Sequence, residues 1–240
     1  MRSPTFEISG VILDVDGTLV DSNDAHAAAW QTAFDTTPEL QGFNHINFDR
    51  IRHLIGKGGE KLLLELTGLE KDSDLGKRLS ALRSKIFSEN YLPFLKPFEG
   101  SEPLLKQFHE NGLRLAIASS AEAGELKSLL KICGADKYVE EVSSSDDAKH
   151  SKPDPDIIQA ALKKMKLQPS QAVMLGDTPY DIEAATRAGC KCIAFRSGGW
   201  SDLDLMGAFA VYDDVGDLLT QYDISIFAQK KLKNSHFKAA

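Results

Sequence analysis

Two aspartates, Asp14 and Asp16, stand one residue apart at the end of the short β-branched segment 9–15. Because ligands bind at the carboxyl ends of the strands in an open α/β sheet, both carboxylates are expected at a ligand-binding mouth. Gly17 follows them and permits a tight turn that keeps the two side chains near one point. Carboxylate oxygens are ligands that Mg²⁺ prefers, whereas the structural alternative is a turn in which the aspartates only accept backbone N–H bonds.

Polar residues follow other apolar segments in the same way. Ser119 ends the segment 113–119, and Asp177, with Asp181 shortly after it, follows another apolar run. Lys152 stands in a polar loop and is followed by Pro-Asp-Pro. If the apolar segments are parallel strands, these polar residues come from one edge of the sheet.

The apolar segments alternate with stretches of helical periodicity. Near-continuous apolar strands between helices indicate a parallel sheet with helices on both faces. We therefore expect an α/β fold with a doubly wound parallel sheet. The expected strands are 9–15, 113–119, 172–176, 190–195 and, more weakly, 209–212, and the expected helices of this domain are 121–133, 156–166 and 179–188.

One region, residues 22–94, has helical periodicity and no convincing strand. It separates the first two expected strands by many more residues than an ordinary crossover needs. We predict a helical cap subdomain over 22–94, inserted into a core domain made of residues 1–21 and 95–240. Within the cap, Lys57 lies in the sequence Gly-Lys-Gly-Gly, and such a loop can dip toward the mouth and place a cation near the substrate.

The six residues that begin at Asp14, Asp-Val-Asp-Gly-Thr-Leu, resemble the first motif of the haloacid dehalogenase superfamily in its phosphotransferase form. Three further motifs follow in the family's order: Ser119, then Lys152 before Pro-Asp-Pro, then Gly-Asp-Thr-Pro-Tyr-Asp from Gly176. The inserted helices are similar to the cap of phosphoglycolate phosphatases and β-phosphoglucomutases. The resemblance covers roughly residues 9–220 and implies that family's Rossmann-like core.

The resemblance implies catalytic and metal-binding roles for the aspartates. Asp14 would be the nucleophile that forms an aspartyl-phosphate, and Asp16 would protonate the leaving oxygen and then take a proton from water. Asp14, the backbone carbonyl of Asp16, and Asp177 would hold Mg²⁺, while Asp181 would act behind them by orienting Lys152 or through a water. Charge also favours a cation, because three carboxylates and a phosphate dianion would otherwise face a single ammonium.

The same resemblance implies contacts with the phosphoryl group and the substrate. Ser119 would donate a hydrogen bond to a phosphoryl oxygen, and Lys152 would pair with its charge. The main-chain N–H groups of Gly17 and Ser120 would add donors. His26, on the first cap helix, is expected at the substrate side of the site, where β-phosphoglucomutases carry a histidine that helps to control the acid–base aspartate; the alternative is an ordinary residue between the domains. Ordinary alternatives are a helix cap for the serine and a solvated surface position for the lysine.

Other reactions of the family remain as alternatives. Asp16 argues against carbon–halogen and phosphonate cleavage, because family members with those activities lack this aspartate. A β-phosphoglucomutase-like phosphomutase is the main rival, since His26 and Trp30 match its His-x-x-x-Trp pattern. Against it, glycines occupy the positions of the mutases' phosphate-clamping arginine and of the glutamate before Asp177. The candidate cations for a second phosphate are Arg52, His53 and Lys57. A regulatory protein that keeps the fold without turnover is a third reading.

The enzyme that this pattern favours is a phosphoric monoester hydrolase similar to phosphoglycolate phosphatase. It would use Mg²⁺ and hydrolyse a small phosphorylated metabolite through an aspartyl-phosphate. Sugar phosphates, phosphoglycolate and nucleotide monophosphates fit the motifs equally well.

Composition restricts the partners and the compartment. The 240-residue chain has a net charge of −7, which argues against nucleic-acid binding because that depends on lysine and arginine. No apolar run approaches the roughly 18 residues of a membrane span. The three cysteines lack zinc-ligand spacing, so we expect idle thiols in the cytoplasm. We expect a monomer without nucleic-acid or membrane partners, and a frayed basic tail over 229–240.

Overall fold

The computed structural model describes residues 8–41, 43 and 46–228, so the basic tail at 229–240 lies outside the described residues. Its centre is a six-stranded sheet in the order β3-β2-β1-β4-β5-β6, and all neighbouring strands are parallel. The strands are β1 Gly10–Leu13, β2 Arg114–Ala118, β3 Glu141–Ser143, β4 Ala172–Gly176, β5 Lys191–Phe195 and β6 Ala210–Tyr212. This arrangement confirms the doubly wound α/β prediction, and the strand order changes direction between β1 and β4.

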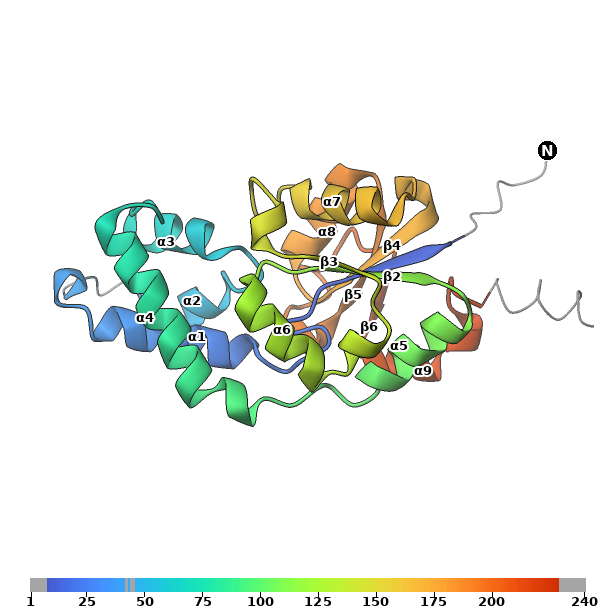
Figure 1. Ribbon diagram of the computed structural model, residues 1–240, viewed down its shortest axis with the longest axis horizontal. Helices are drawn as coiled ribbons and strands as arrows, with labels where there is room; N and C mark the ends of the chain where they lie inside the picture. The colour runs from blue at the N-terminus through green and yellow to red at the C-terminus, as the bar shows by residue number, and fades with distance from the viewer. Residues whose placement is uncertain (1–7, 42, 44–45, 229–240) are drawn as a thin grey trace, which may run out of the picture.

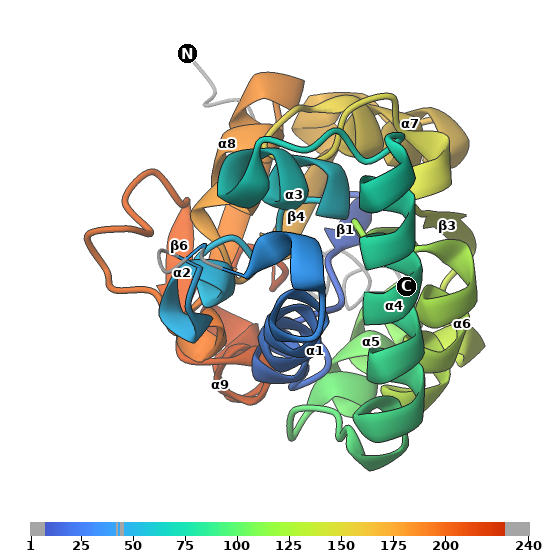
Figure 2. The same cartoon turned by 90° about the vertical axis from the view of Figure 1, so that its left-hand side faces the viewer.

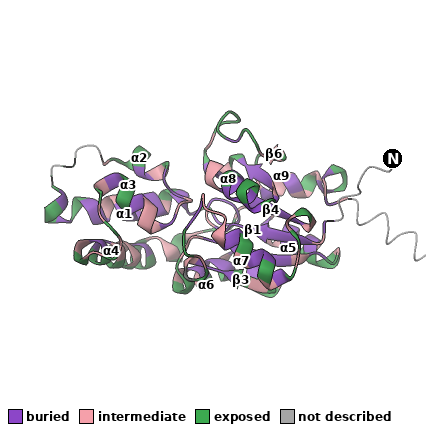
Figure 3. Ribbon diagram, turned by 90° about the horizontal axis from the view of Figure 1, so that it is seen from above, coloured by how far each residue is buried: buried purple, intermediate pink, exposed green. Residues whose placement is uncertain are grey.

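Helices cover both faces of the sheet, with α5, α6 and α9 on one face and α7 and α8 on the other (Figure 1). Successive side chains of β1 alternate accordingly, since Val11 and Leu13 pack with the first group and Ile12 with the second. Buried residues follow the strands and the inner sides of these helices (Figure 3). The helices are α5 Ser101–Glu110, α6 Ala123–Ile132, α7 Asp156–Met165, α8 Pro179–Ala188 and α9 Val215–Thr220.

The chain between β1 and α5 forms a separate group of helices at the left of Figure 1, which faces the viewer in Figure 2. We call residues 22–94 the cap and the rest of the described chain the core. The cap has its own apolar cluster, in which Trp30, Leu63 and Leu79 are buried. Its helices are α1 Asn23–Asp35, α2 Phe48–Arg52, α3 Gly59–Thr67 and α4 Asp74–Asn90. The glycine-rich loop separates α2 from α3, where the sequence predicted an interruption.

The structure differs from the sequence analysis at three places. The sequence analysis did not identify β3, because this strand has only three residues, Glu-Val-Ser, and lies at the edge of the sheet. It also left α5 unassigned. Strand β1 ends at Leu13, so Asp14 and Val15 belong to the connection after the strand and not to the strand itself. No helix in the described part of the chain combines the length and apolarity needed to cross a membrane.

Candidate active site

The register of the strands brings the polar residues that follow β1, β2 and β4 to the same edge of the sheet. Leu13 of β1 is level with Ile117 of β2 and with Leu175 of β4. The residues that follow these three strands therefore lie together at the carboxyl edge. Asp14, which follows β1, lies between Ser119, which follows β2, and Asp177, which follows β4. Parallel strands produce this convergence whatever their separation in the sequence.

Lys152 is the cation of this edge and is fully buried. Its Nζ lies 2.7 Å from Oδ2 of Asp14 and 2.8 Å from Oδ1 of Asp181. Burial alone would lower the pKa of this ammonium, but the two carboxylates more than offset burial and raise it, so Lys152 is charged. The structure thus brings together the predicted lysine, the predicted nucleophile and the residue predicted to orient the lysine.

Asp14, Asp177 and Asp181 form a buried group whose carboxylate oxygens lie within 4.8 Å of one another. Burial raises the pKa of Asp14 well above its ordinary value, and the nearby carboxylates add to this effect. Burial and the charge of Asp181 raise the pKa of Asp177 to about 7. These shifts show that Lys152 does not neutralise the group by itself. Clustered hard oxygen atoms short of positive charge fit a divalent cation such as Mg²⁺.

Other side chains fix the orientation of these carboxylates. Thr18 Oγ1 donates to Oδ1 of Asp177 at 2.9 Å, and Asn23 Nδ2 donates to Oδ2 at 2.8 Å. Asp181 Oδ2 accepts bonds from the Thr178 hydroxyl at 2.7 Å and from its backbone N–H at 3.1 Å, which closes a capping box at the start of α8. Asp181 therefore both caps α8 and holds Lys152.

Asp16 lies where the cap meets the core and is held by two donors. Ser22 Oγ donates to its Oδ1 at 2.5 Å, and Nε2 of His26 lies 2.7 Å from the same oxygen. Burial raises the pKa of Asp16, but its contacts with His26, Ser22 and Arg83 outweigh burial, and the net shift is downward. Asp16 is therefore held as a carboxylate, the form that can take a proton.

The donors also define the tautomer of His26. Arg83 of α4 contacts Nδ1 of His26, and a guanidinium can only donate, so Nδ1 is the acceptor and Nε2–H donates to Asp16. His26 stacks on Phe87 with ring centroids 4.1 Å apart, and Nη1 of Arg83 lies 2.8 Å from Oε2 of Glu125 on core helix α6. The cap thus reaches Asp16, the predicted acid–base residue, through a connected series of polar contacts.

A cavity of about 90 Å³ lies between the cap and the carboxyl edge of the sheet. Its lining includes Asp14, Asp16, Lys152, Ser120, Arg83 and Glu125. Lys57 also lines the cavity, but its ammonium lies 2.6 Å from Glu65 and 4.8 Å from the centroid of the Tyr180 ring. Within this structure Lys57 is therefore balanced by a carboxylate of the cap.

The predicted phosphate-binding groups differ in their surroundings. Ser119 is fully buried, and its Oγ accepts the N–H of Ala121 at 3.1 Å. Helix α6 begins only at Ala123, with Glu122 as its N-cap, so this bond belongs to the turn before the helix and the helix-cap alternative for Ser119 is wrong. Ser120 lines the cavity and donates to the carbonyl of Gly56 at 3.3 Å. Gly17 has φ +72°, and its N–H donates to the Val20 carbonyl at 2.8 Å. Gly17 therefore shapes the turn, and its N–H is used within the chain.

Sequence reasoning did not identify Thr18, Asn23, Arg83 and Glu125 as site residues. Thr18 lies inside the first motif, and this position was the available signal. Arg83 and Glu125 gave no signal, because charged residues on amphipathic helices are usually solvated and only the packing of α4 against the core brings them to the cavity.

Comparisons with known proteins find matches over most of the chain. A family model for haloacid dehalogenase-like hydrolases matches residues 11–195. The chain is 26% identical over 193 residues to pyrophosphatase PpaX of Halalkalibacterium halodurans. This matched region covers 77% of this chain and 82% of that protein. It is 32% identical over 187 residues to a phosphoglycolate phosphatase of Nitrosospira multiformis, with 76% and 80% covered. The crystal structure of a hydrolase from Pseudomonas syringae has a TM-score of 0.81 and 30% identity, and covers 90% of this chain and 98% of that one.

Proposed function

Because the chain belongs to the haloacid dehalogenase-like hydrolase family and is an enzyme with phosphatase relatives, we propose that it is a Mg²⁺-dependent phosphatase of small phosphorylated metabolites. The observation that carries this proposal is the position of Asp14. Its carboxylate is buried at the exit of β1, 2.7 Å from Lys152 and beside two further buried carboxylates. This is the arrangement that a carboxylate nucleophile needs for phosphoryl transfer.

Asp14 attacks the phosphorus atom in this mechanism, and an aspartyl-phosphate forms on its side chain. Lys152 orients Asp14 beforehand and pairs with the negative charge of the transferred group. Asp181 holds the lysine in place through the 2.8 Å contact. Ser119 carries a hydroxyl hydrogen that can be donated to a phosphoryl oxygen at the same edge.

Asp16 handles the protons. As a carboxylate held by Ser22 and His26, it can accept the proton of the water that hydrolyses the aspartyl-phosphate. The first step needs the opposite form, in which Asp16 donates a proton to the leaving oxygen. The second step leaves Asp16 protonated, and that proton is the one donated to the leaving oxygen in the next turnover. Because the contact with His26 disfavours the acid form, this contact is released while Asp16 carries the proton.

Mg²⁺ would lie at Asp14, Asp177 and the main-chain carbonyl of Asp16, with Asp181 close by. When bound, the ion supplies positive charge that draws the phosphoryl group toward the carboxylates. Thr18 and Asn23 keep the oxygens of Asp177 in a fixed orientation.

Two of the three cations that could hold a second phosphate for the phosphomutase alternative are paired with carboxylates. Arg52 lies 2.6 Å from Asp24 and donates to the Gly198 carbonyl at 2.9 Å, while Lys57 is paired with Glu65. Hydrolysis therefore remains the favoured reaction.

The substrate class is a sugar phosphate, phosphoglycolate or a nucleotide monophosphate. Three free, buried cysteines support a reducing compartment such as the cytoplasm.

A panel of phosphorylated metabolites with Mg²⁺ tests the proposal, with products followed as well as free phosphate. We expect phosphate release from at least one substrate, and Asp14→Asn should lower kcat at least about a thousandfold. The matched control is Asp21→Asn, which changes an exposed aspartate of the same segment and should keep native activity. Native turnover in Asp14→Asn would contradict the proposed mechanism, and transfer without phosphate release would identify a mutase.

A further inference from the structure

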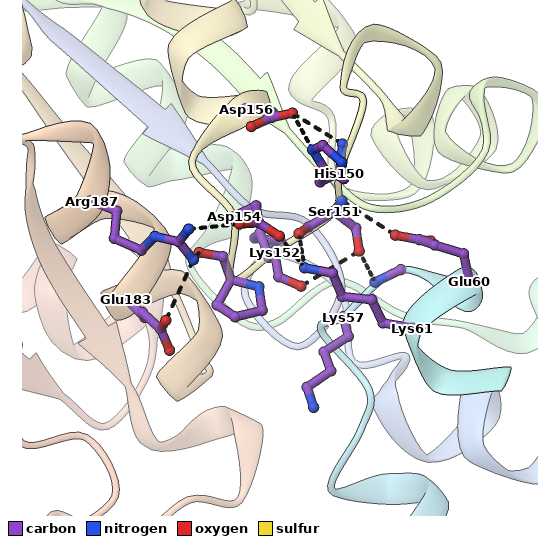
Figure 4. A network of polar contacts seen from close by, with 12 residues as sticks. Lys57, Glu60, Lys61, His150, Ser151, Lys152, Asp154, Asp156, Glu183 and Arg187 are labelled. Carbon is purple, nitrogen blue, oxygen red and sulfur yellow. Dashed lines mark hydrogen bonds and ion pairs between the residues drawn. The ribbon is translucent and has the colours of Figure 1, made fainter. Parts of the chain in front are cut away.

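The loop that carries Lys152 is held by the first turn of cap helix α3 (Figure 4). We propose that Glu60 and Lys61 are positioning residues that latch the cap onto this loop and thereby fix the ammonium of Lys152. The inference rests on the proposed function, because it concerns the lysine that would pair with the phosphoryl group.

Each polar group of Ser151, the residue before Lys152, is bonded by the cap. The Ser151 N–H donates to Oε1 of Glu60 at 3.2 Å, and Nζ of Lys61 donates to the Ser151 carbonyl at 2.6 Å. The hydroxyl of Ser151 accepts the N–H of Gly58 at 3.0 Å. Core groups also hold this backbone, since the Ser151 carbonyl accepts the N–H of Asp154 at 3.0 Å and the His150 N–H donates to Asp156 at 3.1 Å. The cap therefore adds three bonds to a loop that the core already holds in part.

Asp154 extends the latch on the C-terminal side of Lys152. Its Oδ2 lies 2.6 Å from the Lys61 ammonium, and its Oδ1 lies 2.7 Å from Nη2 of Arg187 on α8. Helix α8 also carries Asp181, the direct partner of the Lys152 ammonium. Lys152 is thus fixed between the cap on one side and α8 on the other.

The latch requires the cap to lie close to the core. A Cβ atom placed on Gly58 would lie 2.6 Å from Cβ of Ser151, so only glycine permits this approach. The side chains of Lys61 and Asp154 are 26% and 29% exposed, which leaves the pair partly protected from water. When the cap moves away, all of these bonds break together, and cap position is thereby coupled to the position of the lysine.

Kinetics of wild type, Lys61→Met and Glu60→Ala separate positioning from simple adhesion between cap and core. If the latch positions Lys152, kcat at saturating substrate falls at least about fivefold in both variants, with a smaller change in KM, on the best substrate of the panel. Adhesion alone would raise KM and leave kcat unchanged, and that result overturns the proposal. Two conservative variants keep the donor or the acceptor, so Lys61→Arg and Glu60→Gln should recover most of kcat.

Lys77→Met is the matched control, because Lys77 is an exposed lysine of cap helix α4. Its kcat should equal that of wild type. Thermal melting of every variant checks that the fold is kept.

Hydrogen exchange tests the latch without any assay of activity. We expect the amides of His150, Ser151, Lys152 and Asp154 to exchange several-fold faster in Lys61→Met than in wild type or Lys77→Met. Equal exchange in all three proteins overturns the latch. Suppose that wild type hydrolyses no substrate, while residues 150–154 of the Lys61→Met variant exchange faster than those of wild type. The proposed function then fails while the latch stands.

Discussion

At the scale of single residues, charge balance dominates the site. Three buried carboxylates face one buried ammonium, and the pKa of Asp177 rises to about 7 as a result of burial and the charge of Asp181. Neutral donors such as Thr18 and Asn23 orient the carboxylates without adding charge. A divalent cation would relieve this repulsion while keeping Asp14, the proposed nucleophile, ionised.

Asp177→Asn should therefore separate stability from metal binding. Removing one carboxylate relieves repulsion, and the amide can still bond Thr18 and Asn23, so the melting temperature without metal should equal or exceed that of wild type. The rise in melting temperature caused by Mg²⁺ should disappear, and kcat/KM should fall on the order of a hundredfold. Calorimetry with and without Mg²⁺ measures both, with Asp72→Asn at an exposed position as the control. A full Mg²⁺ response in Asp177→Asn would exclude this residue as a ligand.

Arg83→Met tests how the cap controls the acid–base aspartate. Methionine keeps much of the packing over Phe87 but removes the donor to Nδ1 of His26, so the ring is free to adopt the tautomer that cannot donate to Asp16. We expect kcat to fall about tenfold, within the range typical of general acid–base contributions. Nitrogen NMR shifts of His26 should report the change of tautomer. Arg78→Met, at an exposed position of the same helix, is the control, and an unchanged His26 spectrum in Arg83→Met would refute the assignment.

At the scale of elements, the turns after strands place the side chains. The turn after β1 reverses the chain at Gly17, which has φ +72° and lies against Asn23 and Asp177. The capping box at the start of α8 fixes Asp181 by the same hydrogen bonds that begin the helix. Catalytic positioning thus uses local structures that also stabilise the fold.

Gly17→Ala and Gly112→Ala should have different effects although both glycines have positive φ. At Gly112, with φ +69°, a Cβ would meet nothing within 4 Å, so only backbone strain of roughly 1–2 kcal/mol is expected. At Gly17 a Cβ would lie 2.0 Å from Nδ2 of Asn23 and 2.1 Å from Oδ2 of Asp177, which displaces the site. Urea unfolding and activity assays should show a larger loss of stability and loss of turnover only in Gly17→Ala. Equal losses in both variants would show that strain alone matters.

At the scale of the whole molecule, cap and core have separate apolar clusters and meet mainly through polar contacts. These include Arg83 with Glu125, Lys61 with Asp154, and the Tyr180 hydroxyl, which donates to the His53 carbonyl at 2.6 Å. Polar contacts exchange for water at low cost, whereas separation of the two sides of one apolar core does not. This division favours movement of the cap as a unit over the site.

The three cysteine thiols are buried, so their reactivity depends on whether the core is folded. Burial raises the pKa of Cys133 and of Cys190 to about 11, and burial also raises that of Cys192. Since the folded pKa exceeds the unfolded value near 9.0, the stability from protonated thiols is complete below that value and is lost as pH rises toward 11. Native protein at about pH 8 should therefore react slowly with iodoacetamide, and urea-unfolded protein quickly at all three sites. Rapid labelling of the native protein would contradict the buried state of these thiols.

The sequence by itself determined the doubly wound core and the inserted helices, and it predicted Asp14, Lys152 and Asp177, which the structure brings to one edge of the sheet. Apolar periodicity and the motifs at strand ends involve residues that are close together in the chain, so they can be recognised from the sequence alone. The sequence did not determine β3, because a short edge strand has no pattern of its own. It also did not determine the partners of Lys57, Arg83 and Lys61. The contacts of Arg83 and Lys61 join residues far apart in the chain, and many surfaces can satisfy a charged helical side chain equally well. Only the packing of the cap against the core selected Glu125 and Asp154 as their partners, and the fold of the cap itself selected Glu65 for Lys57, because ion pairing depends on distances that tertiary structure alone decides.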